Sequence, residues 1–274
     1  MASDKWQRKW NVASRKWQVF VLLVTCHLSL GTLLSLASLP AAEPIERWGL
    51  PEGTVHKSGP LRYAMDPATG EASWVLEYLT LDTISGTGAD VAPRPGAFHA
   101  DDTIPAEYRV RSSDFAKSGF DIGHLAPNAD FGSAGDRAAT FLLSNTTPQQ
   151  PTLNRGLWRH LEDRTRQELD GASAELWVVT CPLWIASADE LKVRVIGRHR
   201  VSVPTHYAKC VLPLHQHEHA PARLVAWIVP NAEPTAGATE ELFRVPTRDV
   251  ETAARLNFWP DLEAKLQEEL ETAK

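Results

Sequence analysis

Residues 120–132 read FDIGHLAPNADFG, and residues 141–154 read FLLSNTTPQQPTLN. Together they form the densest polar run of the chain. They lead into residues 154–169, where Leu157, Trp158 and Leu161 share one face and charged residues occupy the others. Apolar residues spaced three and four apart are typical of an amphipathic helix. The sequence therefore predicts that this polar region enters a helix at Asn154.

Short runs rich in β-branched and aromatic residues surround this region, separated by loops rich in Pro, Gly, Asp and Asn. We predict strands at residues 73–81, 140–144, 175–180, 192–196, 208–214 and 224–229. A second helix is predicted over residues 260–273, because Pro260 opens it and Asp261 and Glu263 follow in its first turn. Strands and helices do not alternate regularly. We therefore expect an α+β fold with a mostly antiparallel central sheet flanked by helices.

Residues 19–37 read VFVLLVTCHLSLGTLLSLA, an uncharged apolar stretch that follows a basic segment. This order is typical of a secretory signal, and the stretch is also long enough to be a membrane anchor. Tryptophans at helical spacing before it leave an amphipathic mitochondrial presequence as a third interpretation. We expect residues 1–42 to be a signal peptide or membrane anchor with a short linker, and residues 43–274 to be a single domain. The protein is then secreted, periplasmic or tethered through residues 19–37, with a mitochondrial location as the alternative.

The chain has 274 residues, of which 43% are hydrophobic and 23% are charged. This composition excludes a wholly disordered chain and a disulfide-stapled miniprotein. The net charge is −6, and because residues 1–37 are basic, the rest of the chain carries about −10. Such an acidic body argues against the broad basic surface that many nucleic-acid-binding proteins carry. Cys181 and Cys210 leave two possibilities, a disulfide or a pair of buried free thiols.

Three residues in the polar region have side chains suited to hydrolytic chemistry. His124 follows an Asp-x-Gly turn, and histidine suits a general base because its ordinary pKa is close to neutral. Asn154 starts the predicted helix, where it also makes a good N-cap. Glu162 lies eight residues further on, roughly 12 Å along and about 80° around an ideal helix. This separation suits a carboxylate that reaches the water shell of an ion such as Mg²⁺, which takes few protein ligands.

Three ordered motifs bring these residues together. Residues 121–124 read Asp-Ile-Gly-His, residues 144–149 read Ser-Asn-Thr-Thr-Pro-Gln, and Leu153-Asn154 is followed by Trp158 and Leu161-Glu162. Their combination resembles the non-specific DNA/RNA endonucleases with a ββα-metal site, and in particular the endonuclease G branch. The resemblance extends over roughly residues 46–260, because segments such as Arg47–Pro51 and Val203–His206 also look like that branch.

The resemblance implies a role for each matching residue. His124 would be the general base and Asn154 the one direct protein ligand of Mg²⁺ or Mn²⁺. Glu162 would hold the ion through water, and Asn145 would orient the site. Arg166 and Arg94 would contact phosphate. The substrates would be DNA and RNA, and the protein would be a homodimer.

Two positions depart from the family pattern. Ile122 replaces the arginine of Asp-Arg-Gly-His, which removes a cation on the phosphate side. This departure keeps open an alternative function, a catalytically impaired, membrane-tethered module that binds nucleic acid. Cys181 stands where the branch usually has glycine before Pro182.

Three histidines outside the motifs form the sequence HQHEH at residues 215–219. On a strand, His215, His217 and His219 would share one face and suit Zn²⁺ or Cu²⁺. Pro213 and Pro221 instead favour a solvated loop at this place. The acidic charge of the body predicts that the basic surface is a small cleft near Arg94 and Arg166 rather than a broad groove.

Overall fold

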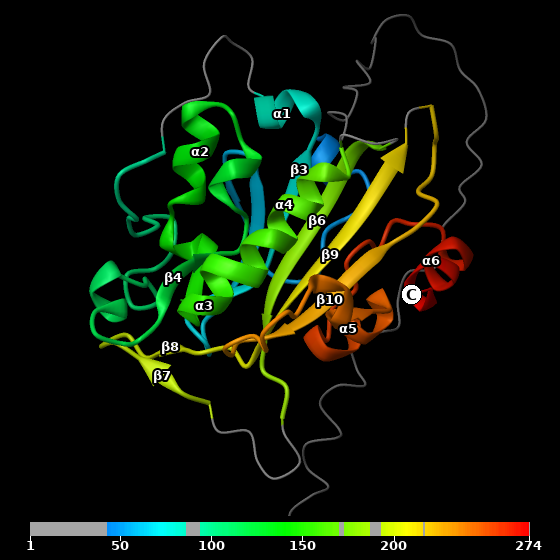
Figure 1. The fold of residues 1–274 in the computed structure, drawn as a ribbon. Helices are drawn as coiled ribbons and strands as arrows, with labels where there is room; N and C mark the ends of the chain where they lie inside the picture. The colour runs from blue at the N-terminus through cyan, green and yellow to red at the C-terminus, as the bar shows by residue number, and fades with distance from the viewer. Residues whose placement is uncertain (1–42, 86–93, 170–172, 187–192, 216, 274) are drawn as a thin grey trace, which may run out of the picture. The chain divides into compact units, whose positions relative to one another are not determined.

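The computed structural model describes residues 43–85, 94–169, 173–186, 193–215 and 217–273. Its centre is a seven-stranded sheet in the order β1-β2-β3-β6-β9-β10-β11, with every neighbouring pair antiparallel (Figure 1). These strands are Val55–Ser58, Leu61–Asp66, Glu71–Leu79, Ser173–Leu183, His206–His215, Val225–Pro230 and Arg244–Val245. The predicted α+β class with an antiparallel central sheet is confirmed.

Two small sheets and several helices complete the described part of the chain. Strand β4 (Asp121–His124) pairs with β5 (Thr146–Gln149), and β7 (Val195–Ile196) pairs with β8 (Val201–Ser202), both antiparallel. The α-helices are α1 (Leu81–Ser85), α2 (Ala134–Thr140), α3 (Pro151–Leu153), α4 (Arg159–Gln167), α5 (Thr247–Ala254) and α6 (Ala264–Thr272). A π-helical turn, Asn154–Trp158, joins α3 to α4. Short 3-10 turns lie at Pro44–Glu46, Ser112–Phe115, Asn128–Asp130, Leu143–Asn145 and Glu240–Phe243.

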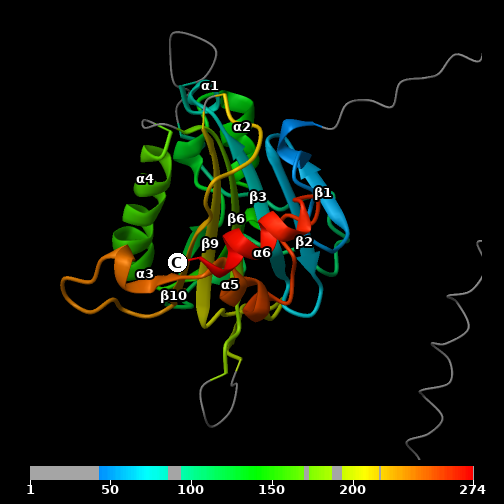
Figure 2. The ribbon, with the colours of Figure 1, turned by 90° about the vertical axis from the view of Figure 1, so that its right-hand side faces the viewer.

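The central sheet separates two hydrophobic cores. Along β6, Leu176 and Val178 pack in the core that receives the helical run from α3 to α4, whereas Trp177 and Val179 pack in the core that receives α5 and α6. Successive side chains of a strand point to opposite faces, which explains this alternation. Figure 2 shows α3 and α4 on one side of the sheet and α5 and α6 on the other. The helical run from α3 to α4, which follows the polar region in the sequence, therefore packs on one face of the central sheet.

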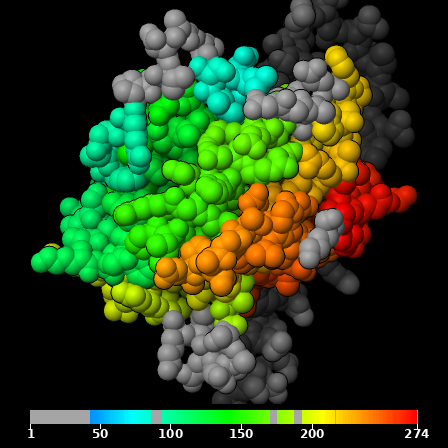
Figure 3. All heavy atoms as spheres, viewed as in Figure 1, coloured from blue at the N-terminus to red at the C-terminus, as the bar shows by residue number. Residues whose placement is uncertain are grey.

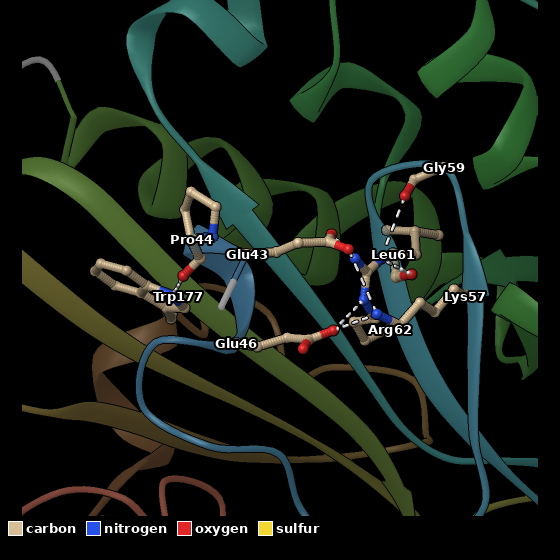
Figure 4. A network of polar contacts seen from close by, with 8 residues as sticks. All are labelled: Glu43, Pro44, Glu46, Lys57, Gly59, Leu61, Arg62 and Trp177. Carbon is tan, nitrogen blue, oxygen red and sulfur yellow. Dashed lines mark hydrogen bonds and ion pairs between the residues drawn. The ribbon is translucent and has the colours of Figure 1, made fainter. Parts of the chain in front are cut away.

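A buried arginine joins the first described residues to the sheet (Figure 4). Arg62 of β2 is 3% exposed and pairs with the carboxylates of Glu43 and Glu46. Nearby, the indole Nε1 of Trp177 in β6 donates to the carbonyl of Pro44 at 2.9 Å. Because the two carboxylates neutralise the guanidinium, β2 can bury a charged residue.

The predictions at residues 73–81, 175–180, 208–214 and 224–229 correspond to β3, β6, β9 and β10. The strand predicted at residues 140–144 is wrong, because α2 ends at Thr140 and a 3-10 turn follows at Leu143–Asn145. Phe141 and Leu143 are each 2% exposed, so their apolar character reflects packing from an irregular segment. At residues 192–196 the described strand is only Val195–Ile196.

The C-terminal helix begins later than predicted. Glu263 is its N-cap, and the carboxylate accepts the backbone N–H groups of Lys265 and Leu266. The predicted start at Pro260 instead lies in a turn, where the N–H of Asp261 donates to the carbonyl of Trp48. A carboxylate that caps two N–H groups fixes the start of this helix more strongly than the preceding proline does.

The two cysteines of the described part are buried free thiols. They lie in the neighbouring strands β6 and β9, and burial raises the pKa of Cys181 to about 12. Cys181 and Pro182 continue β6 without a turn. The interpretations of residues 1–42 lie outside the described residues, and no helix among the described ones is long and apolar enough to cross a membrane.

Candidate active site

His124 stands at the end of β4, and its imidazole packs against two aromatic rings. The ring centroids of Phe98 and Phe141 lie 4.9 and 5.1 Å from that of His124. Its Nε2 is buried and has no hydrogen-bond partner among the described residues. Burial, reinforced by the charge of Arg94, lowers the pKa of His124 to about 3. The imidazole is therefore neutral near neutral pH and offers an unpaired nitrogen.

The β4–β5 pair that carries His124 depends on a glycine. A Cβ placed on Gly123 would lie 2.6 Å from the Cβ of Gln149, which is fully buried. No larger residue fits at this position without moving β5. The close approach explains why glycine precedes the histidine.

Asn145 fixes the backbone that follows His124. Its Oδ1 accepts the N–H of Ala126 at 2.9 Å, and its Nδ2 donates to the carbonyls of Ala126 and Thr140, each at 2.9 Å. Its backbone carbonyl also accepts the N–H of Leu125 at 3.0 Å. Since the side chain is 1% exposed and uses both ends of its amide, Asn145 positions the loop and does not reach the surface.

Asn154 does not cap the helix, contrary to the prediction. The helix begins at Pro151, and the cap is Gln150, whose Oε1 accepts the N–H of Leu153 at 2.8 Å. Asn154 therefore lies one turn inside the helical run with its side chain available for other contacts. Its Nδ2 donates to Oδ2 of Asp121 at 2.9 Å, and this bond leaves Oδ1 as a free acceptor.

The π-helical turn Asn154–Trp158 alters how Asn154 and Glu162 face each other. A turn closed by i→i+5 bonds holds more residues than an α-helical turn, so each residue advances through a smaller angle. Asn154 and Glu162 are eight residues apart, and on an ideal α-helix their side chains would point roughly 80° apart around the axis. The π-helical turn makes this angle smaller. The wider turn brings the amide and the carboxylate closer to one face of the helix.

Glu162 lies above a group of buried charges on the central sheet. Desolvation raises the pKa of Glu162 to about 8, while Lys209 of β9 opposes this shift. Lys209 is 1% exposed, and its Nζ lies 3.8 Å from Oε1 of Glu77 and 2.8 Å from Oγ1 of Thr180. Glu162 itself has no ion pair with a described residue within 4 Å, so its carboxylate is available to a ligand.

The two predicted phosphate contacts have different surroundings. The Arg94 side chain is exposed, and its guanidinium lies 5.4 Å from the ring of Phe141, close to His124. Arg166 pairs through Nη1 with the buried Asp130 and through Nη2 with Asp163. Arg94 is therefore open to an anion, whereas Arg166 is engaged within the protein.

The oxygen atoms of Asn154 and Glu162 suit a hard divalent cation. An amide oxygen and a carboxylate are the kinds of ligand that Mg²⁺ prefers, and Mg²⁺ keeps much of its water shell. The described residues contain no group of three or more His, Cys, Asp or Glu that could hold a metal. The histidines at positions 215, 217 and 219 do not form such a group. His215 is the last residue of β9, and His217 has a left-handed φ of 69°, so the strand face that the three would share does not continue past His215.

Sequence reasoning missed Asp121 as a member of the site. Its carboxylate accepts from Asn154 and forms a forked pair with Arg155. Burial of Asp121 raises its pKa, but the bonds from Arg155 and Asn154 outweigh this and lower it. Its place three residues before His124 in the same Asp-Ile-Gly-His motif was the available signal.

Comparisons with known proteins identify a family over most of the chain. The family described as DNA/RNA non-specific endonuclease matches residues 49–265. Mitochondrial endonuclease G of Bos taurus is 33% identical over 229 residues, which cover 81% of this chain and 74% of that protein. Mitochondrial endonuclease G of Homo sapiens is also 33% identical, with 75% of its length covered. Nuclease C1 of Cunninghamella echinulata is 34% identical over 205 residues, covering 70% of this chain and 77% of the relative.

A solved structure shows the same fold. The crystal structure of the EndoG/EndoGI complex superposes with a TM-score of 0.74 at 27% identity. The match covers 81% of this chain and 92% of that one. Both β4–β5 and the helical run from α3 to α4 fall within the residues that the family matches.

Proposed function

Because this chain belongs to the DNA/RNA non-specific endonuclease family, we propose that it is a metal-dependent endonuclease that hydrolyses phosphodiester bonds of DNA and RNA. In this proposal β4, β5 and the helical run from α3 to α4 form a ββα-metal motif. The observation that carries the proposal is the buried, unpartnered Nε2 of His124. A neutral imidazole nitrogen without a partner is what a general base requires before substrate binds.

His124 would take a proton from the attacking water. The water oxygen bonds to phosphorus, the bond to the 3′ oxygen breaks, and that oxygen takes a proton from solvent, so the products are a 5′ phosphate and a 3′ hydroxyl. The anionic phosphate would raise the pKa of His124 from its low value in the free protein, because an opposite charge favours the imidazolium. Asn145 keeps the backbone after His124 in place, and Arg94 would bind a phosphate oxygen beside it.

Asn154 and Glu162 would hold the ion, Mg²⁺ or Mn²⁺. Asn154 would bind directly through the Oδ1 that its bond to Asp121 leaves free, and Glu162 would act through water. When bound, the ion supplies charge stabilisation for the phosphoryl oxygens and the leaving oxygen. Asp121 fixes which end of the Asn154 amide faces that position.

A nicking assay on supercoiled plasmid tests the proposal. The protein is expected to nick the plasmid with Mg²⁺ or Mn²⁺ and to stop when EDTA is added. Asn154→Ala is expected to lose metal-dependent cleavage, whereas Asn257→Ala, an exposed asparagine after α5, retains it. Cleavage by Asn154→Ala with unchanged metal dependence would move the ion elsewhere. Binding without nicking under all conditions would instead support the alternative, a catalytically impaired binding module.

The remaining inferences concern location and assembly. The mitochondrial names of the bovine and human relatives favour the presequence among the three interpretations of the N-terminal segment. A tagged full chain that colocalises with a mitochondrial marker tests this, and an export signal would instead send it out of the cell. The homodimer and the small basic cleft stay predictions.

A further inference from the structure

Arg155 is an exposed arginine directly beside Asn154. Its Nε donates to Oδ2 of Asp121 at 2.8 Å and its Nη2 to Oδ1 at 2.6 Å. The side chain is nevertheless 71% exposed. A guanidinium carries five N–H donors, so the forked pair uses two of them and leaves the outer edge of the group free. Asp121 thus holds the plane of Arg155 in a fixed orientation without consuming its capacity to bind an anion.

The other groups near Asn154 do not supply a free cation on that side. Arg166 is engaged with Asp130 and Asp163. Ile122, next to Asp121, is apolar and packs against the core around Phe115 and Val201. Arg94 lies over the ring of Phe141, close to His124.

Arg159 is a second exposed arginine on the same helical run. It lies four residues after Arg155, its side chain is exposed, and it forms no side-chain hydrogen bond or ion pair with a described residue. Figure 3 shows the helical run from α3 to α4 at the surface of the molecule. Residues four apart on a helix are neighbours on its surface, and both arginines are exposed.

We propose that Arg155 and Arg159 form a phosphate-binding track for the backbone of the substrate strand, with Arg155 nearest the ion that Asn154 would hold. The inference rests on the proposed function and adds to it the side from which the strand enters. The track is selective for phosphate geometry and not for base sequence, because a planar guanidinium edge binds two phosphate oxygens at once. Orientation of Arg155 by Asp121 lowers the conformational cost of that contact.

Salt dependence of binding tests this track. The parent is the full chain with His124→Ala, kept in EDTA so that the strand is not cut, and the probe is a fluorescein-labelled single-stranded DNA of mixed sequence. Each phosphate contact contributes about 0.7 to the slope of log affinity against log salt for single strands. Arg155→Gln is therefore expected to lower the slope by about 0.7, and the double variant with Arg159→Gln by about 1.4. Over an approximately fourfold rise in salt, the parent should lose about 2.6-fold more affinity than Arg155→Gln.

Arg164→Gln is the matched control. Arg164 lies on the same helix and loses the same charge, but it follows Arg159 by five residues, which turns it about 140° away around the helix, so its variant should keep the parental slope. An unchanged slope in Arg155→Gln, or an equal fall in Arg164→Gln, would overturn the track while leaving the nuclease assignment intact. If the wild-type chain does not nick plasmid and the parent does not bind the probe, the proposed function fails together with the track. Thermal unfolding of each variant confirms that it is folded.

Discussion

Removal of the Asn145 side chain should destabilise the fold and not only slow catalysis. Asn145→Ala deletes three hydrogen bonds of 2.9 Å and leaves the N–H and carbonyl of Ala126 and the carbonyl of Thr140 without these partners. A net hydrogen bond contributes about 1 kcal/mol, and each orphaned buried group costs about 1–3 kcal/mol. With three such groups, we therefore expect the free energy of unfolding to fall by about 3 kcal/mol or more. This is a large part of the roughly 5–15 kcal/mol that stabilises a typical domain.

Urea unfolding followed by tryptophan fluorescence measures this loss, with extrapolation to zero urea. Asn145→Asp is a sharper companion variant, because it keeps the acceptor for the N–H of Ala126 but turns carboxylate lone pairs toward two carbonyls. It should be at least as unstable as Asn145→Ala. Asn257→Ala is the control, since it removes a single exposed hydrogen bond, from Gln267, and such a surface change is expected to alter stability by about 0.5 kcal/mol or less.

The result that would refute the reasoning is a small loss. If Asn145→Ala unfolds within about 1 kcal/mol of the wild-type chain, the three bonds do not hold the loop after His124. A stable Asn145→Ala that cleaves at the wild-type rate would also remove Asn145 from the site. A stable but inactive variant would instead assign Asn145 a direct role with substrate.

Three further predictions concern other parts of the chain. Burial raises the pKa of Glu251 to about 8. The folded state thus keeps a proton that the unfolded state releases, and stability is lost as pH rises from about 4.5 to about 8. Glu251→Gln keeps the acceptor for the N–H of Phe258 and should match the wild-type Tm near pH 5 but exceed it above about pH 8; a lower Tm there contradicts the shift. In a Cys26→Ser chain, Cys181 and Cys210 should react with a thiol reagent only after denaturation, because both are buried, and rapid native labelling would disprove this. Replacement of His215, His217 and His219 by alanine should leave plasmid nicking unchanged, whereas loss of zinc-dependent cleavage would restore a metal site there.

The central strands could be predicted from the sequence because their apolar residues are contiguous and buried on both faces of the sheet. Strand β2 could not, because Arg62 interrupts its pattern, and only the distant Glu43 and Glu46 make its burial tolerable. Strands β4 and β5 are too polar to show an alternating pattern, and Pro148 lies within β5. Their pairing depends on the close approach of Gly123 to Gln149, and a contact between residues so far apart in the sequence leaves no local pattern.

The motifs identified His124, Asn154 and Glu162, but they did not give the local geometry. The helix start at Pro151 placed Asn154 inside the helical run, and the π-helical turn after it has no composition signal. The engagement of Arg166 with Asp130 depends on residues 36 positions apart. The availability of Arg155 could also not be read from its position alone, because it depends on the forked contact with Asp121.

The central claim is that His124 is the general base. The measurement that tests it most directly is the rate of Mg²⁺-dependent nicking of supercoiled plasmid by His124→Ala, with His160→Ala, an exposed histidine on α4, as the control. We expect His124→Ala to lose about 10²-fold or more in rate while it binds single-stranded DNA as the wild-type chain does. Cleavage by His124→Ala at near the wild-type rate would contradict the account.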